Sequence, residues 1–312
     1  MTAIINTKGL SKVYGSGANS TRALSHLDLN IQQGEIFGFL GPNGAGKTTT
    51  IRLLLDLIRP TDGSATIFGE DVREKSVSLH QRIGFLPGEL NLWKNRTAKQ
   101  VVTYVASVRG DEKTQLQEAQ KLADRLQFDL SKKIREYSTG NKRKLGLILA
   151  LMHRPDLLIL DEPTSGLDPL MQQTFNQMMK EFRADGRTVF LSSHVLSEVQ
   201  SICDRVGILR DGELKAVENI EKLTHVDFRF IEMTFRDVIP QAWLAKLQTL
   251  EGVSDISATG DKLSVKLFGD FDPLMRTITD GYLVDMHIKE PSLEDIFLNF
   301  YGDKEQVERV RA

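Results

Sequence analysis

The sequence predicts an α/β protein of two domains, a wound sheet over residues 1–222 and a smaller α+β domain over residues 223–312. Three observations lead to this division. The 312 residues suffice for about two domains of ordinary size. Up to residue 222, short apolar segments alternate with helical patterns. After residue 222 the pattern changes to strands of alternating polarity with short helices between them. The second domain is therefore expected to fold as a separate accessory or regulatory module.

The first domain opens with β structure and then changes to helix. We expect strands at residues 4–5, 10–14, 24–31 and 36–40. From Gly46 onward apolar residues recur at helical spacing, and the helix is expected to continue until Pro60 stops it. Further short strands are expected at residues 65–68, 83–86, 157–160, 189–191 and 206–209. Residues 97–151, between the second and third of these, are predicted to form a helical insertion.

The second domain shows the order β-α-β-β-α-β, which is typical of a ferredoxin-like module. A capped amphipathic helix is expected after its last strand, at residues 292–301, where Ser292 precedes Leu293 and Glu294. The elements of the module are expected at residues 226–235, 240–250, 253–258, 263–268, 273–279 and 282–288.

Composition excludes several function classes. Lysine and arginine number 40 against 42 acidic residues, which gives none of the basic excess typical of nucleic-acid-binding proteins. The single cysteine, Cys203, excludes an internal disulfide framework. The longest apolar runs, such as residues 147–152, fall short of the roughly 18 residues that a membrane-spanning helix needs. The first ten residues show no secretory signal.

The strongest motif lies between the predicted strand 36–40 and the helix that follows. It matches G-x-x-x-x-G-K-[ST], whose glycines let successive backbone N–H groups point at phosphate oxygens. Lys47 is expected to reach the β- and γ-phosphates of ATP, and the Thr48 hydroxyl is expected to coordinate Mg²⁺. The whole predicted nucleotide-binding loop consists of Gly41, Pro42, Asn43, Gly44, Ala45, Gly46, Lys47, Thr48 and Thr49.

A second element supplies acidic residues. The apolar segment 157–160 reads as a buried strand, and its carboxyl end delivers Asp161 to the site as a Mg²⁺ ligand. Glu162 follows and is predicted to act on water as the general base. His194 ends a further strand-like run, where a lone histidine is usually structural.

Together these motifs resemble the nucleotide-binding domain of ATP-binding cassette (ABC) transporters, over roughly residues 3–220. The resemblance implies a P-loop fold with an antiparallel β subdomain and a helical insertion. It also implies that Tyr14 stacks on adenine and that His194 contacts the γ-phosphate. Ser138 and Gly140 match the signature loop that meets the γ-phosphate in a partner subunit, and Asp168 matches the loop that crosses the dimer interface, called the D-loop.

Two departures from the family pattern stand out. The signature loop carries Tyr137, Thr139 and Asn141 where the family has leucine, glycine and glutamine. At the position of the glutamine of the family's Q-loop the chain has Gly88, which offers no side-chain ligand, and Glu89 follows it.

The resemblance further implies a role and partners. We expect a homodimer that hydrolyses ATP with Mg²⁺, bound peripherally at the cytoplasmic face of the cell membrane to a separate permease chain. The insertion 97–151 and the Q-loop region are expected to form the docking groove. The exporter class for drugs, antibiotics or lipids is favoured by the signature loop and by residues 291–297. An importer ATPase is the alternative, and a soluble cassette ATPase acting on ribosomes or DNA is a third reading.

Overall fold

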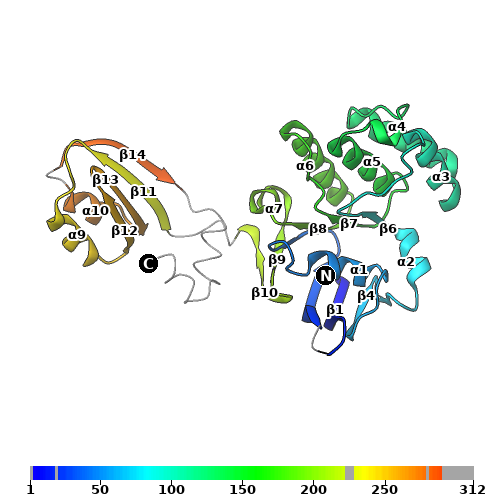
Figure 1. The fold of residues 1–312 in the computed structure, drawn as a ribbon, viewed down its shortest axis with the longest axis horizontal. Coiled ribbons are helices and arrows are strands. Elements are labelled where there is room, and N and C mark those ends of the chain that lie inside the picture. Colours follow the sequence, from blue (N-terminus) through cyan, green and yellow to red (C-terminus); the bar gives the residue numbers. More distant parts are fainter. Residues whose placement is uncertain (1–2, 18–19, 222–227, 279–280, 290–312) are drawn as a thin grey trace. The chain divides into compact units, whose positions relative to one another are not determined.

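The computed structural model describes residues 3–17, 20–221, 228–278 and 281–289. The chain divides into two compact units, Met1–Ile220 and Glu221–Ala312 (Figure 1). The helix predicted at residues 292–301, and the stretch 291–297 used to favour an exporter, lie outside the described residues.

The first unit is built on a six-stranded sheet with the strand order β10-β9-β3-β8-β7-β6. Neighbouring strands from β9 to β6 are parallel, and β10 pairs antiparallel at one edge. Every residue of β7 and β8 is buried, as expected for parallel strands covered on both faces. The strands are β3 (Ile36–Leu40), β6 (Ile83–Leu86), β7 (Leu157–Asp161), β8 (Thr188–Ser193), β9 (Arg205–Arg210) and β10 (Glu213–Asn219).

A second, antiparallel sheet with the order β2-β1-β4-β5 forms the predicted β subdomain. Its strands are β1 (Ala3–Tyr14), β2 (Thr21–Gln32), β4 (Asp62–Ile67) and β5 (Glu70–Asp71). The prediction of separate strands at residues 4–5 and 10–14 was wrong. Gly9, with a φ of 56°, lets β1 shift register against both neighbours and continue as one strand.

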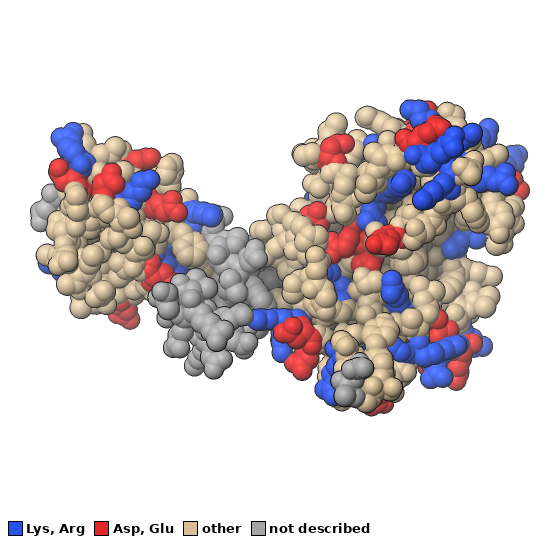
Figure 2. Space-filling model, in the orientation of Figure 1, with Lys and Arg blue, Asp and Glu red and all other residues tan. Residues whose placement is uncertain are grey.

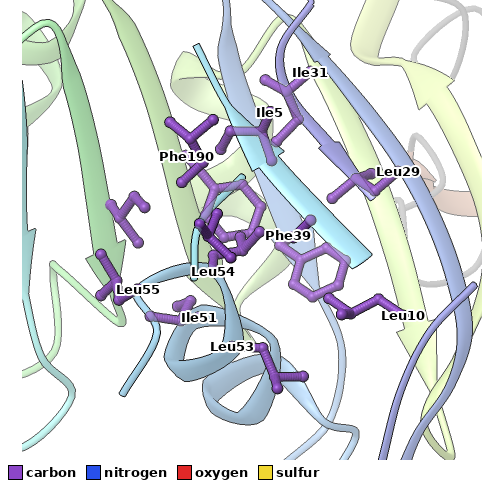
Figure 3. Packing of buried hydrophobic residues seen from close by; sticks show 14 of the residues in the cluster. Ile5, Leu10, Leu29, Ile31, Phe39, Ile51, Leu53, Leu54, Leu55 and Phe190 are labelled. Carbon is purple, nitrogen blue, oxygen red and sulfur yellow. The ribbon is translucent and has the colours of Figure 1, made fainter. Parts of the chain in front are cut away.

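Helix α1 (Lys47–Leu54) packs among the side chains of both sheets. Ile51 and Leu54 belong to the same buried cluster as Phe39 and Phe190, whose ring centroids are 5.4 Å apart, and Leu54 lies beside Phe190 in Figure 3. The helix ends before Pro60, where the sequence had placed its stop. Asp56 adopts a left-handed φ of 54° instead. The N–H groups of Asp56 and Leu57 then bond to carbonyls of the last helical turn, which closes the helix.

The helical insertion consists of separate helices rather than one long stretch. Helices α3 (Ala98–Arg109) and α4 (Glu112–Arg125) are divided at Gly110 and Asp111, both of which have positive φ. A short 3₁₀ turn (Ile134–Glu136) precedes α5 (Thr139–Leu151). The remaining helices described in this unit are α2 (Ser76–Arg82), α6 (Pro169–Ala184) and α7 (Leu196–Ile202).

The second unit confirms the predicted order β-α-β-β-α-β. Its sheet is antiparallel throughout with the order β12-β13-β11-β14, which is the ferredoxin-like arrangement. The two helices and the sheet share one apolar core that includes Trp243, Leu247 and Leu274. The elements are β11 (Phe228–Phe235), α9 (Gln241–Gln248), β12 (Val253–Thr259), β13 (Lys262–Phe268), α10 (Asp272–Thr277) and β14 (Leu283–Lys289).

Candidate nucleotide-binding and catalytic site

The predicted phosphate-binding loop connects β3 to α1, and its backbone requires glycine. Gly44 and Gly46 have φ values of 84° and 108°, a region that favours glycine. A Cβ at Gly46 would lie 2.5 Å from the carbonyl oxygen of Ala23, and one at Gly41 would lie 2.3 Å from that of Leu209. The loop leads directly into the amino end of α1, where free N–H groups and the helix dipole favour an anion. This arrangement fits a polyphosphate.

Lys47, at the start of α1, is almost fully buried. Its Nζ donates to the carbonyl oxygens of Gly41 at 2.6 Å and Pro42 at 3.2 Å. The same ammonium lies 3.4 Å from Oε1 of Glu162. Lys47 therefore places a positive charge between the loop and the acidic residues that follow β7.

Asp161 ends β7, and its buried carboxylate accepts one hydrogen bond at each oxygen. Oδ2 accepts a hydrogen bond from the Thr48 hydroxyl at 2.8 Å, and Oδ1 accepts one from the Ser192 hydroxyl at 2.5 Å. A hydroxyl and a carboxylate oxygen are ligands that suit Mg²⁺, which usually completes its shell with phosphates and water. No cluster of three His, Cys, Asp or Glu side chains that could hold a metal by themselves occurs among the described residues.

Glu162 adopts a left-handed φ of 52°, which is uncommon for a residue with a side chain. Its N–H donates to the backbone oxygen and the hydroxyl of Ser192, each at 3.2 Å. The carboxylate is thereby turned back so that Oε2 lies 2.7 Å from Nδ1 of His194 and Oε1 faces Lys47. Backbone conformations of this kind concentrate at functional sites.

These groups surround one cavity of about 370 Å³. Several predicted residues lie outside its lining: Tyr14, Gly41, Pro42, Ala45, Ser138, Gly140 and Asp168. Tyr14 ends β1, with its ring centroid 5.2 Å from Nζ of Lys12. Ala23 and Arg143 line the cavity and were missed by sequence reasoning, and Ser165 of the predicted D-loop also lines it. The full lining is Ala23, Asn43, Gly44, Gly46, Lys47, Thr48, Thr49, Gly88, Arg143, Asp161, Glu162, Ser165 and His194.

The signature loop begins α5 beside the D-loop. Ser138 caps the helix, and its hydroxyl accepts from the N–H of Asn141 at 3.3 Å. A Cβ at Gly140 would lie 2.5 Å from the carbonyl oxygen of Gly166, so only glycine fits against the D-loop. Asp168 caps α6 and accepts from the N–H of Met171 at 2.9 Å.

Tyr137, which replaces the family leucine, is anchored through its hydroxyl. The hydroxyl donates to the carbonyl oxygens of Asp129 at 2.5 Å and Lys132 at 3.2 Å. Burial, followed by the charges of Asp129 and Glu136, raises the pKa of Tyr137 to about 12. The phenol is therefore a fixed neutral donor that ties the signature loop to the turn before it.

Comparison with known proteins identifies the family. The ABC transporter family model matches residues 24–165. The bacitracin transport ATP-binding protein BcrA of Bacillus licheniformis is 39% identical over 242 residues, which cover 76% of each chain. The chain belongs to the ATP-binding proteins of ABC transporters. The linearmycin resistance ATP-binding protein LnrL of Bacillus subtilis is 29% identical to this ABC ATPase, over 96% of this chain and 98% of LnrL.

Solved structures agree with the fold. The ATP-binding subunit of an ABC transporter superposes with a TM-score of 0.64 at 28% identity, covering 70% of this chain and 91% of that one. A dimeric bacterial ABC transporter cassette gives the same TM-score at 25% identity, over 69% and 98% of the two chains. The protein is therefore an ATP-binding ABC ATPase whose cassette has the expected P-loop architecture. Among its described helices, none combines the length and the apolar character required to span a bilayer.

Proposed function

We propose that this ABC ATPase is the ATP-hydrolysing subunit of an exporter that removes drugs, antibiotics or lipids through a separate permease chain. The ATPase role is supported chiefly by the Glu162 carboxylate, which lies between Lys47 and His194. The hydrogen-bonded pair of Thr48 and Asp161 lies beside it. The exporter part is supported by relatives named for bacitracin transport and linearmycin resistance.

In the proposed mechanism the loop N–H groups and Lys47 hold the β- and γ-phosphates. Mg²⁺, held by Thr48 and Asp161, would neutralise phosphate charge. Glu162 accepts a proton from the water that attacks the γ-phosphate, since its carboxylate faces the cavity. His194, 2.7 Å from that carboxylate, orients it and contacts the γ-phosphate. Tyr14 would stack on the adenine.

A second copy of the chain would complete each site. Ser138 and Gly140 stand at the amino end of α5, where the helix dipole favours an anion. Neither residue belongs to the described lining of this chain's own cavity, which supports a role toward the partner's γ-phosphate. Asp168 would act across the same interface. Such mutual completion suits a two-fold symmetric homodimer.

The permease would dock on the helical insertion, at the cytoplasmic face of the membrane. Trp93 and Tyr104 lie side by side with rings 5.2 Å apart, and both are more than half exposed. An open groove of about 680 Å³ lies between α2 and the turn that joins α3 to α4. Val77 and Val108 line it with largely exposed side chains. Exposed apolar groups of this kind are typical of interaction sites. Figure 2 shows lysine and arginine side chains gathered over α3 to α5.

The second unit would regulate the ATPase or support its dimer. It carries its own apolar core, and no described residue in it belongs to the lining of the nucleotide cavity. Deletion of residues 223–312 should therefore leave a cassette that binds ATP. A folded truncation that has lost nucleotide binding would show that the two parts are not separable in this way.

The main test uses Glu162→Gln in the full chain. Without the carboxylate, the variant should bind ATP, stop turning it over, and stay in a closed dimer. Purified with ATP from detergent-solubilised membranes, it should bring along a multi-span membrane protein that mass spectrometry identifies. The double variant Lys47→Met/Glu162→Gln is the matched control, because it lacks the phosphate-binding ammonium and should remain monomeric in ATP.

Different results separate the parts of the proposal. Wild-type turnover by Glu162→Gln would remove Glu162 from the role of general base. Stoichiometric ribosomal proteins or nucleic acid, in place of a membrane protein, would reject the exporter role and leave the ATPase chemistry intact.

A further inference from the structure

Arg143 is a buried cation of the site that neither the motifs nor the family pattern pointed out. It belongs to α5, one and a half helical turns after the signature Ser138. Only 6% of the residue is exposed. Burial lowers the pKa of Arg143, and the charges of Asp161 and Glu162 act in the opposite direction. A cation buried at this depth requires an explanation, because removing it from water is costly.

The guanidinium bonds to backbone carbonyls of two different segments. One nitrogen donates to the carbonyl oxygen of Pro87 at 2.7 Å, and the other donates to that of Gly88 at 2.8 Å. The first nitrogen also lies 3.5 Å from the carbonyl oxygen of Asp161. A planar guanidinium that donates to two successive carbonyl oxygens fixes the backbone orientation of residues 87–88 more tightly than a single hydrogen bond could. Arg143 thus ties the signature helix to the loop after β6.

That loop passes directly beside the Mg²⁺ ligand. A Cβ placed on Gly88 would lie only 3.1 Å from Oδ2 of Asp161. This oxygen is the one that accepts from Thr48. The backbone of residues 87–88 therefore borders the metal side of the cavity, although Gly88 has no side chain to offer it.

We propose that Arg143 is a positioning residue for ATP hydrolysis: it holds the backbone of Pro87 and Gly88 against Asp161 from the signature helix. A shift of α5 then moves the loop beside the metal ligand through the guanidinium instead of through a side chain at residue 88. The inference rests on the ATPase activity of the chain and needs no permease.

The test compares Arg143→Lys and Arg143→Met in the full chain with Mg²⁺-ATP. A displacement near 1 Å in a catalytic site can cost large factors in rate, so we expect kcat to fall by about tenfold or more in Arg143→Met. The KM for ATP should stay within about threefold of the wild-type value, since the phosphate loop is not touched. Arg143→Lys should give an intermediate kcat at the same KM, because an ammonium lacks the planar guanidinium geometry.

Arg125→Met is the matched control. Arg125 also joins two helices, through a two-pronged exposed pair with Glu181 of α6, but it lies away from the cavity. It should keep the wild-type kcat, and melting temperatures should be recorded for every variant. Wild-type kcat in a folded Arg143→Met or Arg143→Lys variant would overturn the proposal. An equal loss of kcat in Arg125→Met would overturn it as well. If Arg143→Met does not fold, the kcat and KM of Arg143→Lys decide.

Discussion

The Ser192→Ala substitution tests how the acidic end of β7 is held in place. Ser192 is fully buried on β8, directly opposite Asp161 in the parallel pairing of the two strands. Its hydroxyl donates to Oδ1 of Asp161 at 2.5 Å and accepts from the N–H of Glu162 at 3.2 Å. Alanine removes the hydroxyl and leaves the backbone unchanged.

The magnitude follows from these two contacts. A hydrogen bond to a charged group contributes about 1.5–3 kcal/mol, and loss of the hydroxyl deprives a buried carboxylate of one of its two donors. The N–H of Glu162 keeps the backbone oxygen of Ser192 as an acceptor, so the loss of its bond to the Ser192 hydroxyl costs little free energy. We therefore expect the free energy of unfolding of the first unit to fall by about 2–3 kcal/mol. For a unit of this size that corresponds to roughly 4–12 °C in melting temperature.

Scanning calorimetry of the full chain is the assay, because the two units can melt as separate transitions. Only the transition of the first unit should move, and kcat should fall because Asp161 and Glu162 lose a common support. Ser201→Ala is the matched control: its exposed hydroxyl bonds to Glu198 and Asn176 at the surface. A shift below about 2 °C in Ser192→Ala would refute the reasoning, since a bond worth less than 1 kcal/mol cannot be what holds Asp161.

Three further predictions follow from the structure. Gly46→Ala should abolish detectable ATP binding in a nucleotide titration, because its Cβ would lie 2.5 Å from the Ala23 carbonyl oxygen. Tyr137→Phe should lower the unfolding free energy by about 1–2 kcal/mol in urea titrations, since it removes a hydroxyl that donates to two carbonyls. Burial, then the charge of Arg109, lowers the pKa of His153 from 6.5 to about 4. As pH falls, the imidazole of His153 is therefore protonated in the unfolded chain before it is protonated in the folded one. The resulting contribution to the free energy of unfolding is fully present above pH 6.5 and is lost as pH falls toward 4, by at most roughly 3 kcal/mol. His153→Gln should flatten that part of a pH titration of unfolding.

The parts of the site that could be predicted from sequence are those that a local pattern determines. The loop from Gly41 to Thr49 needs glycines at fixed positions between a strand and a helix, so spacing alone identifies it. Asp161 and Glu162 follow a short run of apolar residues, which is typical of a buried strand and was predicted as one. Parallel strands bring their carboxyl ends to one edge of a sheet. His194 was predicted from the family resemblance alone, and the structure brings it to within 2.7 Å of Glu162.

Residues that act through pairing between distant segments were missed. Ser192 meets Asp161 only because β7 and β8 are neighbours in this register, and no local pattern states which strands are neighbours. Arg143 meets Pro87 and Gly88 across 55 or 56 residues of chain, through the approach of a helix to a loop. The early end of α1 was missed for a different reason. Its closing residue is Asp56 in the left-handed conformation, where glycine is the usual signal.

These contacts bear on the prediction that Gly88 stands at the place of the family glutamine. Asp161 accepts hydrogen bonds from Thr48 of α1 and from Ser192 of β8. The loop backbone at Gly88 lies beside it, since a Cβ there would come within 3.1 Å of Oδ2. These three neighbours of Asp161 belong to different parts of the cassette, and only the loop at Gly88 is held by the helical insertion, through Arg143. Because Asp161 lies on the sheet and beside a loop that the insertion holds, a movement of the insertion can be transmitted to it. Because the link consists of a side chain gripping backbone carbonyls, it does not depend on which side chain residue 88 carries. On the proposed role of Arg143, the coupling of the signature helix to the Asp161 side of the site therefore does not require a glutamine at residue 88.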